Sequence, residues 1–154
     1  MTRVLFVCLG NICRSAMAEG VFKAKAETSG LDAHIASAGT STWHIGEAPD
    51  PRAQEMALSR GIDISDQRGH QMSAEEFADY DYIIAMDASN LAKLRALGPA
   101  RDHHKIHMML NFADGINETD VPDPYYGGPD GFEDVMDMIE AASDGLIAHI
   151  QAKS

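Results

Sequence analysis

Apolar and polar residues follow two different periods along this chain, and these periods predict its elements. Short runs of β-branched and other apolar residues predict strands, whereas longer stretches with apolar positions at helical spacing predict helices. The strands are expected at about residues 3–8, 34–38, 82–86 and 106–110. The helices are expected at 15–26, at 51–58, from residue 89 onward and over 131–154.

Short strands that alternate with helices are typical of a parallel sheet covered by helices on both faces. The fold class is therefore predicted to be α/β, and 154 residues are enough for a single domain spanning 1–154 with its own core. Two local patterns add detail. Ser73 and Glu76 have the spacing of a capping box, and in the second helix Met56 and Leu58 are expected to face inward.

The segment from Val4 to Ser15 carries the candidate chemistry. A strand ends in Cys8, a turn with Gly10 and Asn11 follows, and a helix begins at once. Arg14 closes the turn, so backbone N–H groups, the helix dipole and the guanidinium are expected to converge on one spot. Such a spot binds a tetrahedral dianion, favours the thiolate of the cysteine beneath it and predicts phosphoryl transfer through a phosphocysteine. The plainer interpretation of Cys8 is a small apolar side chain at a strand end.

A second candidate lies in the loop before the last helix. Pro122 and Pro124 bracket Asp123 and restrict the backbone on either side, as a residue with a positional role requires. The two tyrosines that follow would give its carboxyl group the apolar surroundings that suit a general acid. The alternative, an acidic surface turn, fits Asp120 and Asp130 better.

Several stretches resemble one known family. The first, V-C-L-G-N-I-C-R-S-A-M-A-E, resembles the phosphate-binding loop of the low-molecular-weight protein tyrosine phosphatases. Three more carry the resemblance over essentially the whole chain: S-A-G-T-S-T-W-H-x-G-x-x-P, A-M-D-x-S-N-L and D-P-Y-Y-G. The resemblance implies a four-stranded parallel sheet in the order 2-1-3-4, with the site at the carboxyl ends of the strands. It also implies a cysteine-dependent hydrolase of phosphotyrosine in proteins and of small aryl phosphates, with no metal or organic cofactor.

The resemblance gives the site residues their expected roles. Cys8 is the nucleophile, Arg14 holds the phosphoryl oxygens, and Asp123 acts first as general acid and then as base. In the loop, Ser15 would stabilise the thiolate and Asn11 would adopt a left-handed conformation. The expected phosphate-binding loop residues are Leu9, Gly10, Asn11, Ile12, Cys13 and Ser15. The expected pocket residues are Trp43, Tyr125 and Tyr126.

Some of these positions have simpler interpretations. Ser15 can cap the helix that it opens, and Trp43 can anchor its loop on the core. Asp87 ends the third strand, where ligands bind in open α/β sheets, but capping the next helix is the preferred interpretation. The chain departs from the family pattern at Gln67 and His70, where a His and an Arg are common. The hydrogen bonds that support the loop from below, and their effect on rate, are therefore left open.

Charge and composition exclude some classes of partner. Acidic residues outnumber basic ones by 24 to 12, giving a net charge of −12, so nucleic-acid binding is not expected. An anionic substrate fits where Arg14 and a helix N-terminus dominate locally, because surface charges beyond about 10 Å are screened. No apolar run approaches the length of a membrane span, and the N-terminus shows no leader, so a cytoplasmic location is expected. His103 and His104 are adjacent and no cysteine is near, so a solvated strand edge is expected there and not a metal site.

The two cysteines, Cys8 and Cys13, lie in one loop, which excludes a disulfide framework and suggests a reducing compartment. Arsenate reductases are related enzymes that carry two further cysteines downstream, and this chain has none after Cys13. A module that only binds phosphotyrosine would be expected to lack the nucleophile or the acid, and both are present. Cys13 either packs behind the loop or traps oxidised Cys8 as a recoverable disulfide. The protein substrate and the oligomeric state do not follow from the sequence.

Overall fold

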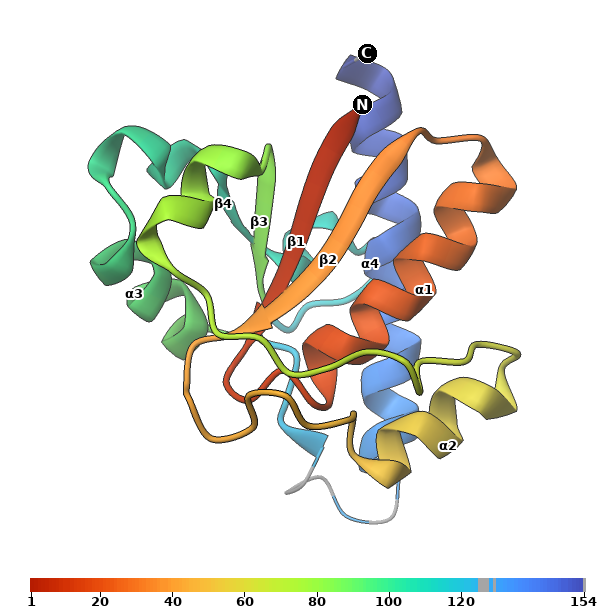
Figure 1. Ribbon diagram of the computed structural model, residues 1–154. Helices are drawn as coiled ribbons and strands as arrows, with labels where there is room; N and C mark the ends of the chain where they lie inside the picture. Colours follow the sequence, from red (N-terminus) through yellow and green to blue (C-terminus); the bar gives the residue numbers. More distant parts are fainter. Residues whose placement is uncertain (125–127, 129, 154) are drawn as a thin grey trace.

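A parallel sheet forms the centre of the molecule (Figure 1). The computed structural model describes residues 1–124, 128 and 130–153. Its strands are β1 (Thr2–Cys8), β2 (Ala33–Gly39), β3 (Tyr82–Ala85) and β4 (Ile106–Met108). They pair in parallel in the order β2-β1-β3-β4, so the predicted α/β class and the order 2-1-3-4 are confirmed.

Strand β1 divides the core into two layers because successive side chains of a strand point to opposite faces. Val4 and Phe6 belong to the core shared with α1 (Arg14–Ser29), α2 (Pro51–Ser59) and α4 (Gly131–Lys153). Leu5 and Val7 belong to the core under α3 (Ala88–Leu97) and the short 3₁₀ helix η1 (Ala74–Asp79). All four side chains are fully buried, which explains why this strand reads as a continuous apolar run.

The structure corrects the predicted elements at three places. Strand β4 ends at Met108, because Met109 and Leu110 turn into the 3₁₀ helix η3 (Met109–Phe112) and pack in the core that includes α4. The histidine segment before it is the 3₁₀ helix η2 (Ala100–Lys105), not a strand edge.

In α2, Leu58 is 64% exposed, so its inward assignment was wrong. Ala53, Met56 and Ala57 have the i, i+3, i+4 spacing of one helix face, and Leu58 lies one position outside it. The capping box of Ser73 and Glu76 is present, although it opens a 3₁₀ helix.

All four strands end at the same edge of the sheet, and the loops that follow β1 and β3 gather there (Figure 1). The segment that enters α4 from η3 reaches this edge too, whereas the two chain termini lie together at the opposite end (Figure 1). No helix in the described part of the chain is long and apolar enough to cross a membrane. The carboxyl edge is therefore where segments distant in sequence converge.

Candidate active site

The turn between β1 and α1 folds back over the end of the sheet. Asn11 has a φ of 58°, the one left-handed non-glycine residue among those described, so its predicted conformation is confirmed. The turn rests on the end of β2, where Gly39 pairs with Cys8. A Cβ on Gly39 would lie 2.9 Å from the carbonyl oxygen of Leu9, so glycine allows this close approach.

The carbonyl groups of the turn are held by the segment that follows β2. The carbonyl oxygens of Cys8 and Leu9 accept hydrogen bonds from the backbone of residues 40 and 41, and that of Ile12 accepts one from Asp50. A trans peptide places each C=O opposite the following N–H. The N–H groups that follow these carbonyls therefore point away from the backbone of residues 40, 41 and 50, and an arrangement of this kind can bind an anion.

A hydrogen-bonded set of side chains surrounds the Cys8 sulfur. The Oγ of Ser15 lies 2.9 Å from this sulfur, and the backbone N–H of Asn11 donates to it at 3.3 Å. The Asn11 side chain donates to the Oγ atoms of Ser15 and Ser37 at 2.8 and 2.9 Å. Since Ser15 already accepts from Asn11, its hydroxyl proton is available to a thiolate. The helix-cap interpretation of Ser15 was wrong, because α1 begins at Arg14 and shows no side-chain cap.

The same set continues to Ser37, Glu19 and Lys23, which the sequence did not point out, and to His70. Ser37 donates to the carboxylate of the buried Glu19 at 2.7 Å, and Lys23 pairs with that carboxylate at 2.6 Å. The backbone N–H of His70 donates to the Asn11 side-chain oxygen at 3.0 Å, while its ring contacts Glu76. The backbone N–H of His70, together with the side chains of Ser37 and Glu19, therefore supports the loop from below.

Arg14 is held from two other elements. Its Nη1 donates to Asp87 at 2.6 Å and to the carbonyl oxygen of Val121 at 3.0 Å. In the described part of the chain no acceptor is bonded to Nη2 or Nε, so that edge of the guanidinium is open to a ligand. Burial alone would lower the pKa of Arg14, but its interactions with Cys8, Asp87 and Asp123 together raise it above its ordinary value. The guanidinium is thus always charged.

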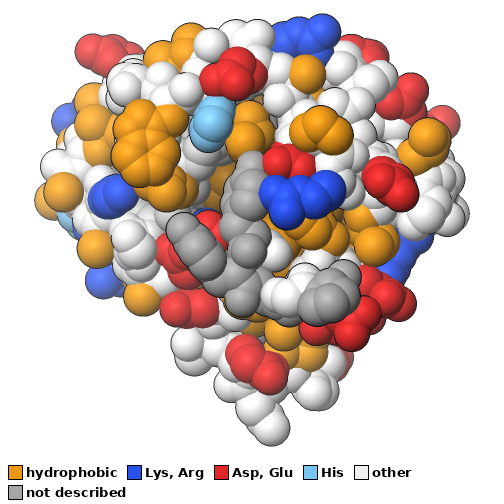
Figure 2. Space-filling view, turned by 90° about the horizontal axis from the view of Figure 1, so that it is seen from below, with side chains coloured by type: hydrophobic (Ala, Val, Ile, Leu, Met, Phe, Trp, Pro, Cys, Tyr) orange, Lys and Arg blue, Asp and Glu red, His pale blue; other side chains and the backbone are white. Residues whose placement is uncertain are grey.

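A pocket of about 210 Å³ opens above the sulfur of Cys8. Figure 2 views the molecule from this end, where exposed hydrophobic side chains stand among acidic ones. Trp43 forms an exposed part of the wall, with 69% of its surface accessible. The lining residues are Cys8, Leu9, Gly10, Ile12, Cys13, Arg14, Trp43, His44 and Asp123.

The pocket thus brings together most of the residues singled out from the sequence, which come from three separate segments. Asn11 and Ser15 lie beneath it as supports, and Tyr125 and Tyr126 lie outside the described residues. His44 was missed, although its ring packs against Gly10 and its Nδ1 lies 3.0 Å from Glu47. Its place directly after Trp43, an expected pocket residue, was the sequence feature that could have indicated a pocket position for His44.

For Asp87 the sequence offered a place near ligands and a helix cap, and the cap was the preferred interpretation. One carboxylate oxygen does cap α3 by accepting from the N–H of Asn90 at 2.7 Å, while the other accepts from Arg14. The pair makes the N-terminus of α3 part of the site. The position of Asp87 at the carboxyl end of a parallel strand was the signal for this second role.

Comparison with known proteins gives one consistent result. The family described as low molecular weight phosphotyrosine protein phosphatase matches residues 3–154. A low molecular weight protein-tyrosine-phosphatase from Streptomyces coelicolor is 44% identical and aligns over 97% of this chain and 93% of its own. YfkJ from Bacillus subtilis, named as the same kind of phosphatase, is 42% identical over 98% and 97%.

The solved structures that this fold resembles include members of the same group of phosphatases. A protein tyrosine phosphatase from Entamoeba histolytica superposes with a TM-score of 0.95 at 38% identity, covering 99% of each chain. The structure of YfkJ from Bacillus subtilis gives a TM-score of 0.94 at 41% identity, over 100% of this chain and 97% of that one.

Proposed function

Because the chain belongs to the low molecular weight phosphotyrosine protein phosphatase family, we propose that it hydrolyses phosphotyrosine in proteins and small aryl phosphates through a phosphocysteine on Cys8. It is an enzyme, a protein-tyrosine phosphatase. The observation that carries the mechanism is the single pocket that joins Cys8, Arg14 and Asp123.

In the first step the Cys8 thiolate attacks phosphorus, the S–P bond forms and the bond to the phenolic oxygen breaks. Arg14 and the N–H groups of the turn hold the equatorial phosphoryl oxygens, where charge accumulates. Asp123 gives its proton to the departing oxygen, which leaves as a neutral phenol. The Arg14 geometry supports this role, since Asp87 and Val121 occupy Nη1 and leave the opposite edge for two oxygens.

In the second step water attacks the phosphocysteine and Asp123 takes a proton from it. The S–P bond breaks, and Cys8 leaves as a thiolate that accepts from Ser15 and from the backbone N–H of Asn11. These two donors stabilise the leaving sulfur without any change of geometry, which is the advantage of a preorganised site. Trp43 lines the same pocket, which supports a role for it in covering one face of a phenyl ring.

A rapid-quench experiment with an aryl phosphate tests the mechanism. Phenol should be released in a burst before steady state, and acid-quenched enzyme should carry phosphate on the peptide that contains Cys8. Cys8→Ser should keep the fold and lose turnover, while Cys13→Ser, the matched change in the same loop, should keep the covalent intermediate. Phosphate found elsewhere, or a Cys8→Ser variant that retains more than a trace of the rate, would contradict the nucleophile assignment.

A further inference from the structure

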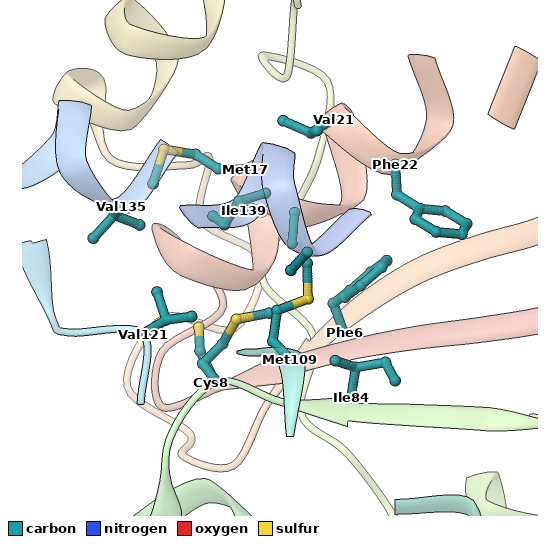
Figure 3. Close-up of a cluster of buried hydrophobic side chains, with 14 of the residues drawn as sticks. Phe6, Cys8, Met17, Val21, Phe22, Ile84, Met109, Val121, Val135 and Ile139 are labelled. Atoms are coloured by element: carbon teal, nitrogen blue, oxygen red, sulfur yellow. The ribbon is translucent and has the colours of Figure 1, made fainter. Parts of the chain in front are cut away.

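The segment that carries Asp123 is attached to the body at the residues immediately before it. Asp120 accepts a hydrogen bond from the backbone N–H of Ala88, the first residue of α3, at 3.1 Å. The N–H of Val121 donates to the carbonyl oxygen of Met86 at 2.7 Å. The side chain of Val121 is fully buried in the same cluster as Cys8 (Figure 3). The two backbone contacts reach Met86 and Ala88, at the junction of β3 and α3.

This attachment is linked to the phosphate site through Nη1 of Arg14, which has two acceptors. The carbonyl oxygen of Val121 accepts from Nη1 of Arg14 at 3.0 Å. The same Nη1 donates to Asp87, whose other oxygen caps α3. The N-terminus of α3 therefore joins two carboxylates, one that holds the phosphate-binding arginine and one from the acid-bearing segment. A helix N-terminus favours such negative charge, and Arg14 offsets the repulsion between the two.

The backbone between the attached residues, Asp120 and Val121, and Asp123 is stiff, so their position fixes that of Asp123. Pro122 stands between Val121 and Asp123, and a proline fixes its own φ and restricts the residue before it. Beyond Asp123, the carbonyl oxygen of Pro124 would lie 2.7 Å from a Cβ on Gly131, so glycine lets α4 approach this side closely. The backbone is therefore held on both sides of Asp123: by the contacts of Asp120 and Val121 before it, and by the close approach of Pro124 to Gly131 after it.

We propose that Asp120 is a positioning residue for the general acid: by capping α3 it fixes the segment that places Asp123 over the phosphate site. The inference rests on the proposed function, since it takes Asp123 to be the acid. It also changes the interpretation of Asp120. This residue is exposed and lies in a polar loop, features that had suggested only a surface acid.

The test compares aryl phosphates that differ in leaving group. Asp120→Ala should lower kcat/KM for phenyl phosphate by roughly three- to tenfold, the size expected from losing one helix cap, and that for p-nitrophenyl phosphate by less than about twofold. Asp120→Asn keeps an acceptor oxygen and should restore both rates. Glu118→Ala removes the same charge from the same loop two residues earlier and should leave both rates unchanged.

A second variant removes the other half of the hydrogen bond. Ala88→Pro deletes the N–H donor at a helix position that tolerates proline, after Asp87 whose extended φ of −145° and ψ of 173° suit a following proline. It should reproduce the leaving-group defect of Asp120→Ala, and the double variant should be no worse than either. Thermal unfolding of each variant identifies any that is not folded.

The outcomes separate the inference from the function on which it rests. A wild type that does not turn over aryl phosphates overturns both. If wild type is active but Asp120→Ala loses kcat/KM equally on both substrates, or loses none, only the role of Asp120 is overturned. A defect that Asp120→Asn does not reverse, or additive losses in the double variant, overturns it as well, since the cap would then not be the cause.

Discussion

The carboxylate of Asp87 joins Nη1 of Arg14 to the N-terminus of α3, at 2.6 Å from the first and 2.7 Å from the N–H of Asn90. Asp87→Asn should separate the two roles, because asparagine is an equally good helix cap but carries no charge. We expect a melting temperature close to wild type and a loss of about tenfold in kcat/KM for p-nitrophenyl phosphate.

Asp87→Ala is the matched variant, which should lose the same activity and also part of the stability. Steady-state kinetics and thermal unfolding on the three proteins provide the comparison. If Asp87→Asn is as active as wild type, the ion pair does not position Arg14.

Replacing Asp123 by Ala should affect substrates in proportion to how much their leaving group needs a proton. Loss of a general acid costs about a hundredfold or more, so phenyl phosphate should show the full effect. p-Nitrophenyl phosphate should lose less, since nitrophenolate leaves readily without protonation. The ratio of the two kcat/KM values is the measurement, and an unchanged ratio would remove Asp123 from the acid role.

Gly69 supports the pocket wall from behind. Its N–H and C=O bond the backbone of Glu47 and Gly46 at 2.8 Å each, and a Cβ would lie 2.0 Å from the carbonyl oxygen of His44. Gly69→Ala should therefore displace the turn that carries Trp43 and raise KM for aryl phosphates more than it lowers kcat. It should also cost about 1–3 kcal/mol of stability, as overpacking usually does.

Gly145→Ala provides the control for Gly69→Ala. A Cβ there would lie 1.7 Å from the carbonyl oxygen of Phe112, in the contact between α4 and η3. It should destabilise the fold to a similar degree without raising KM. Equal changes of KM in the two variants would attribute the effect to stability alone.

The fold was predictable from the sequence because its central strands are buried on both faces and its helices have apolar faces of regular period. The end of β4 was not, since Met108, Met109 and Leu110 form an apolar run that gives no sign of where strand geometry turns into a 3₁₀ helix. Leu58 shows the same limit: its type suits a core, and only the neighbouring helices decide which face of α2 is covered.

For the site, local pattern identified groups that line the pocket, because Cys8 and Arg14 lie within one turn. The supports come from distant segments, and no periodicity connects Glu19 with Ser37, or Ala88 with Asp120. Asp120 looked like an ordinary acid at a turn and Asp87 like a helix cap, since a helix cap and an ion-pair partner have the same residue type. Their second roles depend on tertiary contacts alone.

Histidine protonation should weaken the fold at mildly acidic pH. The ring of His107 lies 5.7 Å from that of Tyr82 and 5.6 Å from that of Phe112, near His149 of α4. Burial first, then the positive charges of His149, Lys153 and His104, lower the pKa of His107 from its ordinary 6.5. The unfolded chain then binds a proton that the folded chain does not, so stability is complete above pH 6.5 and falls as the pH drops toward the folded pKa.

Urea unfolding of wild type and His107→Gln between pH 8 and pH 5 measures this contribution. The variant should be less stable than wild type at high pH and should lose less on acidification. Parallel pH curves for wild type and His107→Gln would show that His107 is not the group involved.

Oxidation by peroxide should inactivate the protein reversibly, because Cys8 and Cys13 both line the pocket. Peroxide entering that pocket should oxidise the Cys8 thiolate to a sulfenic acid, with loss of one oxygen of the peroxide as water. The Cys13 thiol can then displace hydroxide from that sulfur, forming a disulfide and a second water, if the turn brings the two Cα atoms within about 7 Å. Wild type treated with peroxide and then with a thiol reductant should regain most of its activity, whereas Cys13→Ser should not, since its sulfenic acid proceeds to irreversible acids. Equal recovery of the two proteins would leave Cys13 with a packing role only.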